Sequence, residues 1–196
     1  QIGYLLGPRL IELGFQAREE LPLVTLAGPY LDELSALTGD TIHLAIREGD
    51  EVLYLHKNPG RNGPEMRSRV GHRMPLARTG IGKALMLDDT PQEWQRLYEV
   101  SLPAGGKNQF WPQHPEQSWE QFQQRMIEYV AGGYAFDLED NEPSIRCVAA
   151  PIRDASKRIV AGISIASTVP YMPLEKMAEL IPLIKGVTAR LSNDLG

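Results

Sequence analysis

Few side chains in this sequence have the chemistry of a catalytic or metal site. The sequence contains one cysteine, Cys147, and four histidines, and no two histidines have the i,i+3 or i,i+4 spacing of a metal-binding pair on a helix. Cys147 and a histidine would together make a nucleophile and its base. However, Cys147 precedes three apolar residues, and a cysteine in such a run is usually an unreactive small hydrophobe. We therefore expect no catalytic residue, no metal and no cofactor.

Two short motifs look like ligand-binding loops but lack essential residues. Gly82 and Lys83 suggest a phosphate-binding P-loop, yet Ala77 stands where the first glycine belongs and Ala84 where serine or threonine is required. Residues 137–142 are acidic like a calcium loop, but the sixth position is not glycine and the twelfth is a valine. The sequence therefore predicts neither site.

A third segment suits a small anion. Residues 79–85 predict a loop that leads into a short helix, with Gly80 and Ile81 at the helix start. Backbone N–H groups at a helix start attract negative charge, and glycine lets a ligand approach the backbone closely. Alternatively, Gly80 and Gly82 allow the helix to pack tightly on a sheet. Both interpretations remain open from these residues alone.

The composition narrows the class of protein. Apolar residues make up 42% of the chain and charged residues 23%, which is typical of a folded globular protein. The net charge of −5 argues against general nucleic-acid binding by this chain. No apolar run approaches the ~20 residues that span a membrane, so we expect no membrane partner. The single cysteine suits a reducing cytoplasm, and the lack of an initiator methionine suggests part of a longer protein.

Hydrophobic spacing predicts helices at both ends of the chain. The first forty residues carry two apolar stripes of helical period, with Gly39 as a stop and Pro29 as a kink or as the true start of the second helix. Capping boxes at Thr90 and Ser118 begin two more helices, and residues 173–195 predict a closing helix.

The middle and last thirds of the chain predict strands joined by tight turns. Residues 102–115 predict an exposed excursion rich in Gly, Pro and Asn. Hairpin-connected strands with helices around them favour one α+β domain over residues 1–196, with a mostly antiparallel sheet. The predicted strands are residues 41–46, 51–55, 65–70, 134–137, 145–152 and 159–167.

Three groups of segments, in their order and spacing, resemble the effector-binding domain of IclR-type bacterial transcriptional regulators. The resemblance implies a GAF-like fold, which is a curved sheet of about six strands with helices on both faces. It also implies that residues 1–20 are the linker helix from a winged helix-turn-helix domain that is absent from this sequence. The segments are residues 69–76 leading into 79–85, residues 133–139, and residues 145–152 leading into 161–165.

The resemblance also implies a function. Members of this family bind small organic acids, such as keto acids, sugar acids and aromatic acids, and binding changes the grip of the DNA-binding domain on its operator. Dimers and tetramers are usual. We therefore expect a cytoplasmic ligand-sensing domain, a homodimer or homotetramer, that reaches DNA only through the absent domain. Asp137 and the histidines favour an effector with hydroxyl groups.

Carried over by position, the polar site residues would be Gly80, Ile81, Asp137, Cys147 and Ser164. Asp137 would accept a hydrogen bond from a ligand hydroxyl, Ser164 would donate to a carboxylate, and Cys147 would form a small wall. The family often has a second serine two residues after Ser164, where this sequence has Ala166, and this departure leaves the polarity of that wall open. Candidate apolar wall residues, for which ordinary core packing is the alternative, are Met66, Met74 and Ile145.

Other interpretations of the same residues stay open. An enzyme acting on a small acid would use Asp137 as base and Cys147 or Ser164 as nucleophile. A pure oligomerisation module would use the terminal helices, and a solid core beside Gly80 would favour it. Residues 61–83 hold six basic residues and one acidic residue, which suits either steering of an anion or a solvated or intersubunit face. His43 and His56 would reach a polar ligand from adjacent strands.

Overall fold

The computed structural model describes residues 7–102 and 117–196, so most of the predicted excursion at 102–115 lies outside the described residues. The chain alternates between helices and strands in the order predicted. The elements are α1 (Arg9–Glu19), α2 (Pro22–Thr38), β1 (Thr41–Glu48), β2 (Glu51–Asn58), β3 (Arg73–Pro75), the 3-10 turn η1 (Leu76–Arg78), α3 (Gly80–Leu85), α4 (Pro91–Ser101), α5 (Trp119–Gly132), β4 (Ala135–Leu138), β5 (Ile145–Arg153), β6 (Ile159–Thr168), the 3-10 turn η2 (Val169–Tyr171) and α6 (Leu174–Leu195).

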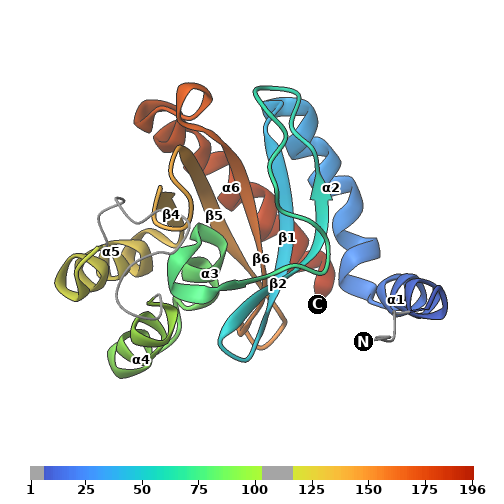
Figure 1. The fold of residues 1–196 in the computed structure, drawn as a ribbon, viewed down its shortest axis with the longest axis horizontal. Helices are drawn as coiled ribbons and strands as arrows, with labels where there is room; N and C mark the ends of the chain where they lie inside the picture. Colours follow the sequence, from blue (N-terminus) through green and yellow to red (C-terminus); the bar gives the residue numbers. More distant parts are fainter. Residues whose placement is uncertain (1–6, 103–116) are drawn as a thin grey trace, which may run out of the picture.

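The six strands form one curved sheet in the order β3-β2-β1-β6-β5-β4, and every pairing is antiparallel (Figure 1). Helices α2 and α6 pack on one face of the sheet, while α3, α4 and α5 lie on the other. The predicted α+β, GAF-like architecture with helices on both faces is therefore confirmed.

The two faces of the sheet differ in chemistry because side chains alternate along each strand. The face toward α2 and α6 is aliphatic, with Ile42, Leu44, Val148, Ile163 and Ile165 fully buried. The face toward α3 bears small or polar residues at the intervening positions, including His43, Cys147 and Ser164, all buried. The α2–α6 side is therefore a conventional hydrophobic core, and the polar groups are concentrated beneath α3.

Local capping signals set the helix ends as predicted. Ser118 accepts a hydrogen bond from the Gln121 backbone while the Gln121 side chain accepts one from Ser118, which completes the capping box of α5. Gly133 ends α5 in the left-handed conformation that favours glycine. The predicted cap at Thr90 likewise accepts from the Glu93 backbone at the start of α4.

One predicted strand is wrong, and one of the two alternatives for Pro29 is excluded. Residues 65–70 are not a strand, because the edge position beside β2 is taken by β3, whose Arg73–Pro75 pairs with residues 51–53. Pro29 does not mark the start of a helix, because α2 already begins at Pro22, where the fixed φ of proline suits the first turn.

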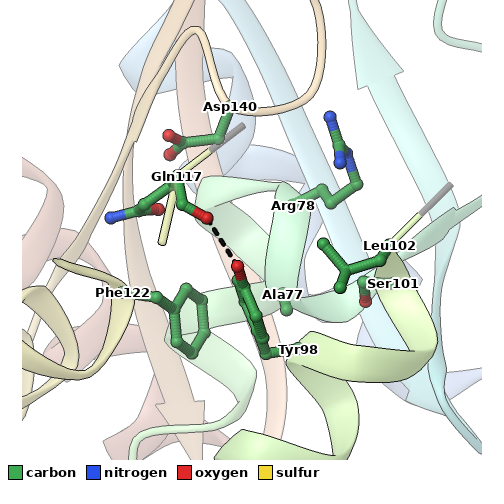
Figure 2. Close-up of a pocket in the computed structure, with 8 residues that line it drawn as sticks. All are labelled: Ala77, Arg78, Tyr98, Ser101, Leu102, Gln117, Phe122 and Asp140. Carbon is green, nitrogen blue, oxygen red and sulfur yellow. Dashed lines mark hydrogen bonds between the residues drawn. The ribbon is translucent and has the colours of Figure 1, made fainter. Parts of the chain in front are cut away.

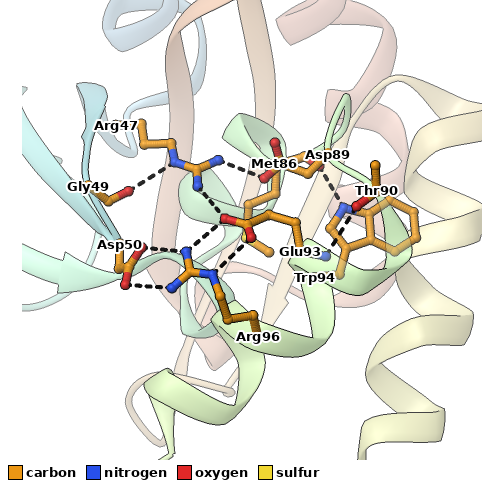
Figure 3. Close-up of polar contacts among 9 residues, drawn as sticks. All are labelled: Arg47, Gly49, Asp50, Met86, Asp89, Thr90, Glu93, Trp94 and Arg96. Atoms are coloured by element: carbon orange, nitrogen blue, oxygen red, sulfur yellow. Dashed lines mark hydrogen bonds and ion pairs between the residues drawn. The ribbon is translucent and has the colours of Figure 1, made fainter.

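Ion pairs fasten the β1–β2 hairpin to the helices on the α3 side (Figure 3). Arg47 donates to Asp89 at 2.6 Å and to Glu93 at 3.0 Å, and Arg96 bridges Glu93 and Asp50. The shared carboxylate of Glu93 makes this a network rather than isolated pairs.

None of the helices in the described part of the chain has the length and hydrophobicity of a membrane span.

Candidate functional site

Helix α3 begins directly against strands β4 and β5. Thr79 caps the helix by accepting a hydrogen bond from the Gly82 N–H at 3.0 Å. A Cβ atom on Gly80 would lie only 2.5 Å from Cys147 Sγ and 2.9 Å from the backbone nitrogen of Asp137. Glycine at position 80 is therefore needed for the close packing of α3 on the sheet.

The strand register brings the predicted polar residues to one face. Asp137 on β4 pairs with Cys147 on β5, and Cys147 pairs with Ala166 on β6. Ser164 lies two residues from Ala166 on the same face and pairs with His43 on β1. Gly80, Asp137 and Cys147 are thus in contact, and Ser164 extends the same polar surface toward β1.

Cys147 is a protonated thiol in this environment. Burial, followed by the nearby carboxylate of Asp137, raises its pKa to about 12, while the N–H groups of Asp137 and Gly80 donate to its sulfur. A thiolate nucleophile at this position is thereby strongly disfavoured. The sulfur accepts a hydrogen bond from the Gly80 N–H, which is one of the donors predicted to bind an anion.

Asp137 is buried and turned toward its own loop. Its Oδ1 accepts the backbone N–H of Asp140 at 2.8 Å. Burial raises the pKa of its carboxyl well above the usual range, against the opposing effect of the Lys83 ammonium. The group is therefore poised to hold a proton far more readily than an exposed aspartate.

A buried charge network that the sequence reasoning missed lies beside Asp137. The ammonium of Lys83, on α3, donates to the Asp140 carboxylate at 2.5 Å and to the Phe136 carbonyl at 3.1 Å. Arg125, from α5, donates to both oxygens of Asp140 at 3.0 Å. Burial disfavours the charged form of Lys83, but the carboxylates of Asp140 and Asp137 outweigh burial and raise its pKa. The signal available in the sequence was a lone lysine in the otherwise uncharged helix of residues 80–85.

His43 closes the polar face at β1. Its Nδ1 lies 3.3 Å from the Ser164 hydroxyl, its Nε2 lies 2.7 Å from the Ser68 hydroxyl, and its ring lies 5.0 Å from the ring of Tyr54. Burial, with a smaller effect of the Lys57 charge, lowers its pKa to about 3. The imidazole is therefore neutral at physiological pH, with one nitrogen donating and the other accepting.

The remaining predicted site residues, which are Ile81 at the helix start and the apolar wall candidates Met66, Met74 and Ile145, have different locations. Ile81 is buried against β6, where a Cβ on Gly162 would lie 3.1 Å from it. Met74 is half-buried against the cluster that α3, α4 and α5 form. Met66 is half-buried in the β2–β3 connection, and Ile145 is half-buried on the same face as Cys147. His56 belongs to β2 and binds Asn58 at 2.5 Å.

Two hollows lie near these elements, and none of the predicted site residues lines either of them. A cavity of about 30 Å³ lies between η1, α4 and α5, where Tyr98 donates to the Gln117 carbonyl and Asp140 forms one wall (Figure 2). This volume holds about one water molecule. A cleft of about 310 Å³ near Arg47 is lined by charges already in ion pairs. Within residues 7–102 and 117–196, no three metal-ligating side chains gather.

Comparison with known proteins identifies the class to which this fold and its buried polar face belong. Residues 15–193 match the model of the bacterial transcriptional regulator IclR C-terminal domain. The chain therefore belongs to the IclR family, as the sequence resemblance predicted. Its relatives are transcriptional regulators, so it is a regulatory domain and not an enzyme.

Individual relatives agree with this classification. The chain is 30% identical over 193 residues to the HTH-type transcriptional regulator KdgR of Escherichia coli K12, covering 98% of this chain and 72% of KdgR. The crystal structure of IclR from Thermotoga maritima has a TM-score of 0.83 at 28% identity, covering 98% of this chain and 76% of that one. The solved C-terminal domain of E. coli KdgR has a TM-score of 0.70 at 28% identity, covering 89% of this chain and 98% of that one.

Proposed function

We propose that this chain is a ligand-sensing domain that binds a small organic acid on the α3-facing side of its sheet. The acid is a hydroxy acid, a sugar acid or a keto acid. Its binding changes the operator affinity of an attached DNA-binding domain, for which residues 1–20 form the linker. The exposed apolar side chains of α1, among them Ile11 and Phe15, support assembly into a homodimer or homotetramer.

The observation that carries this proposal is the concentration of buried polar groups on one face. Asp137, Ser164 and His43 are each at most 4% exposed, and they share the side that Gly80 and Cys147 occupy. A buried polar group without a partner costs about 1–3 kcal/mol. The same sheet buries an aliphatic surface on its opposite face, so polarity beneath α3 is a specific feature rather than a general property of the fold.

The hydrogen-bond donors on this face suit a ligand carboxylate, which would replace the Cys147 sulfur as a stronger acceptor. The Gly80 N–H donates to the Cys147 sulfur, and a thiol is a weak acceptor. A carboxylate oxygen would form a stronger, charge-assisted bond with the same N–H and with the hydroxyl of Ser164. Asp137 would accept from a hydroxyl of the ligand, and in its protonated form it would donate to an oxygen.

A thermal-shift screen against keto acids, aldonates and aromatic acids tests the proposal. A ligand at 100 times its Kd adds about 2.7 kcal/mol, which raises the Tm of a domain of this size by roughly 5–10 °C. Mass spectrometry should recover the ligand unchanged, as expected of a sensor. A broad panel that leaves the Tm unmoved would remove the support for an organic acid.

A variant pair locates the site within the fold. Asp137→Asn should weaken the ligand-induced shift without lowering the Tm of the free protein by more than a few degrees. Glu179→Gln, at an exposed position on α6, is the matched control and should respond to the ligand like the wild type. Equal ligand-induced shifts in the two variants would exclude Asp137 from the site.

A further inference from the structure

The connection from β2 to β3 crosses the α3-facing side of the sheet, where it is drawn in green-cyan in front of β1 and β2 (Figure 1). Its start is fastened to the end of α2 and the start of β1. The Gly60 N–H donates to the Thr41 hydroxyl at 3.1 Å, and the Arg61 N–H donates to the Gly39 carbonyl at 2.8 Å. The first part of the connection is therefore held by its own backbone.

Its end is fastened to β2. The Gly71 N–H donates to the Tyr54 carbonyl at 2.8 Å, and the Tyr54 N–H donates to the His72 carbonyl at 3.1 Å. Between the two anchored parts lie residues 64–70. These seven residues form no ladder with β2.

Two side chains from the sheet hold residues 64–70 from below. Lys57 donates to the carbonyls of Met66 at 2.7 Å and Ser68 at 2.9 Å. His43 Nε2 meets the Ser68 hydroxyl at 2.7 Å. His43 and Lys57 are direct register partners on β1 and β2, so both contacts lie at one place on the polar face.

A glycine stands at each end of this segment. Gly63 and Gly71 flank it, with φ of 76° and 84°, in the left-handed region that favours glycine. A Cβ on Gly71 would meet nothing within 4 Å, so glycine is required there by conformation and not by crowding.

We propose that residues 64–70 are a lid over the effector site and that His43 is the positioning residue that holds this lid shut through Ser68. The inference rests on the proposed function, because the surface beneath the lid is the one assigned to the effector. The Ser68 hydroxyl contacts Nε2 of His43, and the Ser164 hydroxyl contacts Nδ1 of the same ring. A hydroxyl-bearing acid that binds beneath the lid takes the place of the Ser68 hydroxyl on His43, which opens or reseats the lid.

Limited trypsin digestion of the 196-residue chain without ligand tests the lid. Arg67 and Arg69 are exposed lid residues that flank Ser68, and each provides a cleavage site that needs local opening. Ser68→Ala removes the hydroxyl, and His43→Phe keeps the ring but removes both nitrogens. Each variant should speed cleavage at Arg67 and Arg69 about fivefold, the factor that one net hydrogen bond is worth. Cleavage at Lys157, in the exposed β5–β6 turn, should stay unchanged.

Ser156→Ala, in that same turn, is the matched control and should leave lid cleavage at the wild-type rate. If His43→Phe fails to fold, Ser68→Ala decides alone, because Ser68 is a half-buried loop residue. Lid cleavage at the wild-type rate in Ser68→Ala would overturn the proposal. So would equal acceleration at Lys157, since that would reflect general loosening. Because this assay needs no effector, its result is independent of the thermal-shift screen.

Discussion

Lys83 is the buried charge on which the α3 side of the fold depends most. Its side chain is 1% exposed, and its ammonium bonds to Asp140 at 2.5 Å and to the Phe136 carbonyl at 3.1 Å. Lys83→Met retains most of the apolar stem and removes the charge. The Asp140 carboxylate, 10% exposed, then loses one of its two cations and keeps Arg125.

The size of the loss follows from this arrangement. Removing one partner of a buried ion pair costs about 3–5 kcal/mol, because the other charge is left uncompensated. Since Arg125 still binds Asp140, we expect Lys83→Met to lower the free energy of unfolding by about 3 kcal/mol, near the lower end of this range. Asp140→Asn leaves the fully buried ammonium without its nearest carboxylate, so we expect a loss nearer about 5 kcal/mol.

Urea unfolding at fixed protein concentration, followed by circular dichroism, measures both losses. The double variant Lys83→Met with Asp140→Asn should lose less than the sum of the single variants by about 2 kcal/mol, because the two groups interact directly. Arg158→Met removes a cation that is 77% exposed and paired with Asp154, and should cost less than about 1 kcal/mol. If Lys83→Met is as mild as Arg158→Met, or the losses simply add, the network does not stabilise the fold as argued.

Two further predictions concern packing and pH. Gly80→Ala should lower stability by about 1–3 kcal/mol, since the new Cβ would meet Cys147 Sγ at 2.5 Å. Gly186→Ala in α6, where the new Cβ would meet nothing within 4 Å, should raise stability by about 0.5–1 kcal/mol. Thermal unfolding measures both variants, and a higher Tm for Gly80→Ala than for Gly186→Ala would contradict this reasoning. His43 has a folded pKa of about 3, below the unfolded value of about 6.5, so its contribution is complete above pH 6.5 and is lost toward pH 3, by about 1.4 kcal/mol per pH unit. The stability difference between wild type and His43→Gln should shrink at that slope from pH 6 to 5 in urea titrations, and a constant difference would show that His43 does not titrate as inferred.

Local patterns determined most of what the sequence predicted correctly about the fold. Helix ends at Thr90, Ser118 and Gly133 depend on residues within a few positions, so they could be located without a structure. The strand predicted at residues 65–70 is wrong because an alternation of apolar and polar residues is also compatible with an irregular segment. Met66 and Ser68 do turn inward and Arg67 turns outward, yet the ladder with β2 forms eight residues further on. Choosing the edge strand required tertiary competition that no local pattern records.

The grouping of candidate site residues was predictable only where a motif fixes the neighbours. The family resemblance placed Gly80, Asp137 and Cys147 in one group, and the strand register brings these three residues together. Lys83, which follows Gly80 by three residues, was rejected as part of a P-loop, and its partner Asp140 is 57 residues away in sequence. The distance in sequence hides such a pair, since its energy depends on burial that only the folded chain creates.

The division of the sheet into two faces explains how this fold tolerates a polar interior. The aliphatic face against α2 and α6 buries large side chains such as Leu31, Leu34 and Ile163 completely. Burying each such side chain contributes about 1.5–3 kcal/mol. That contribution offsets the cost of holding neutral His43 and the raised-pKa carboxyl of Asp137 out of water. Under the proposals above, Asp137→Asn and Ser68→Ala should therefore act on ligand binding and on the lid with little loss of stability, whereas truncation of Leu31 should act on stability alone.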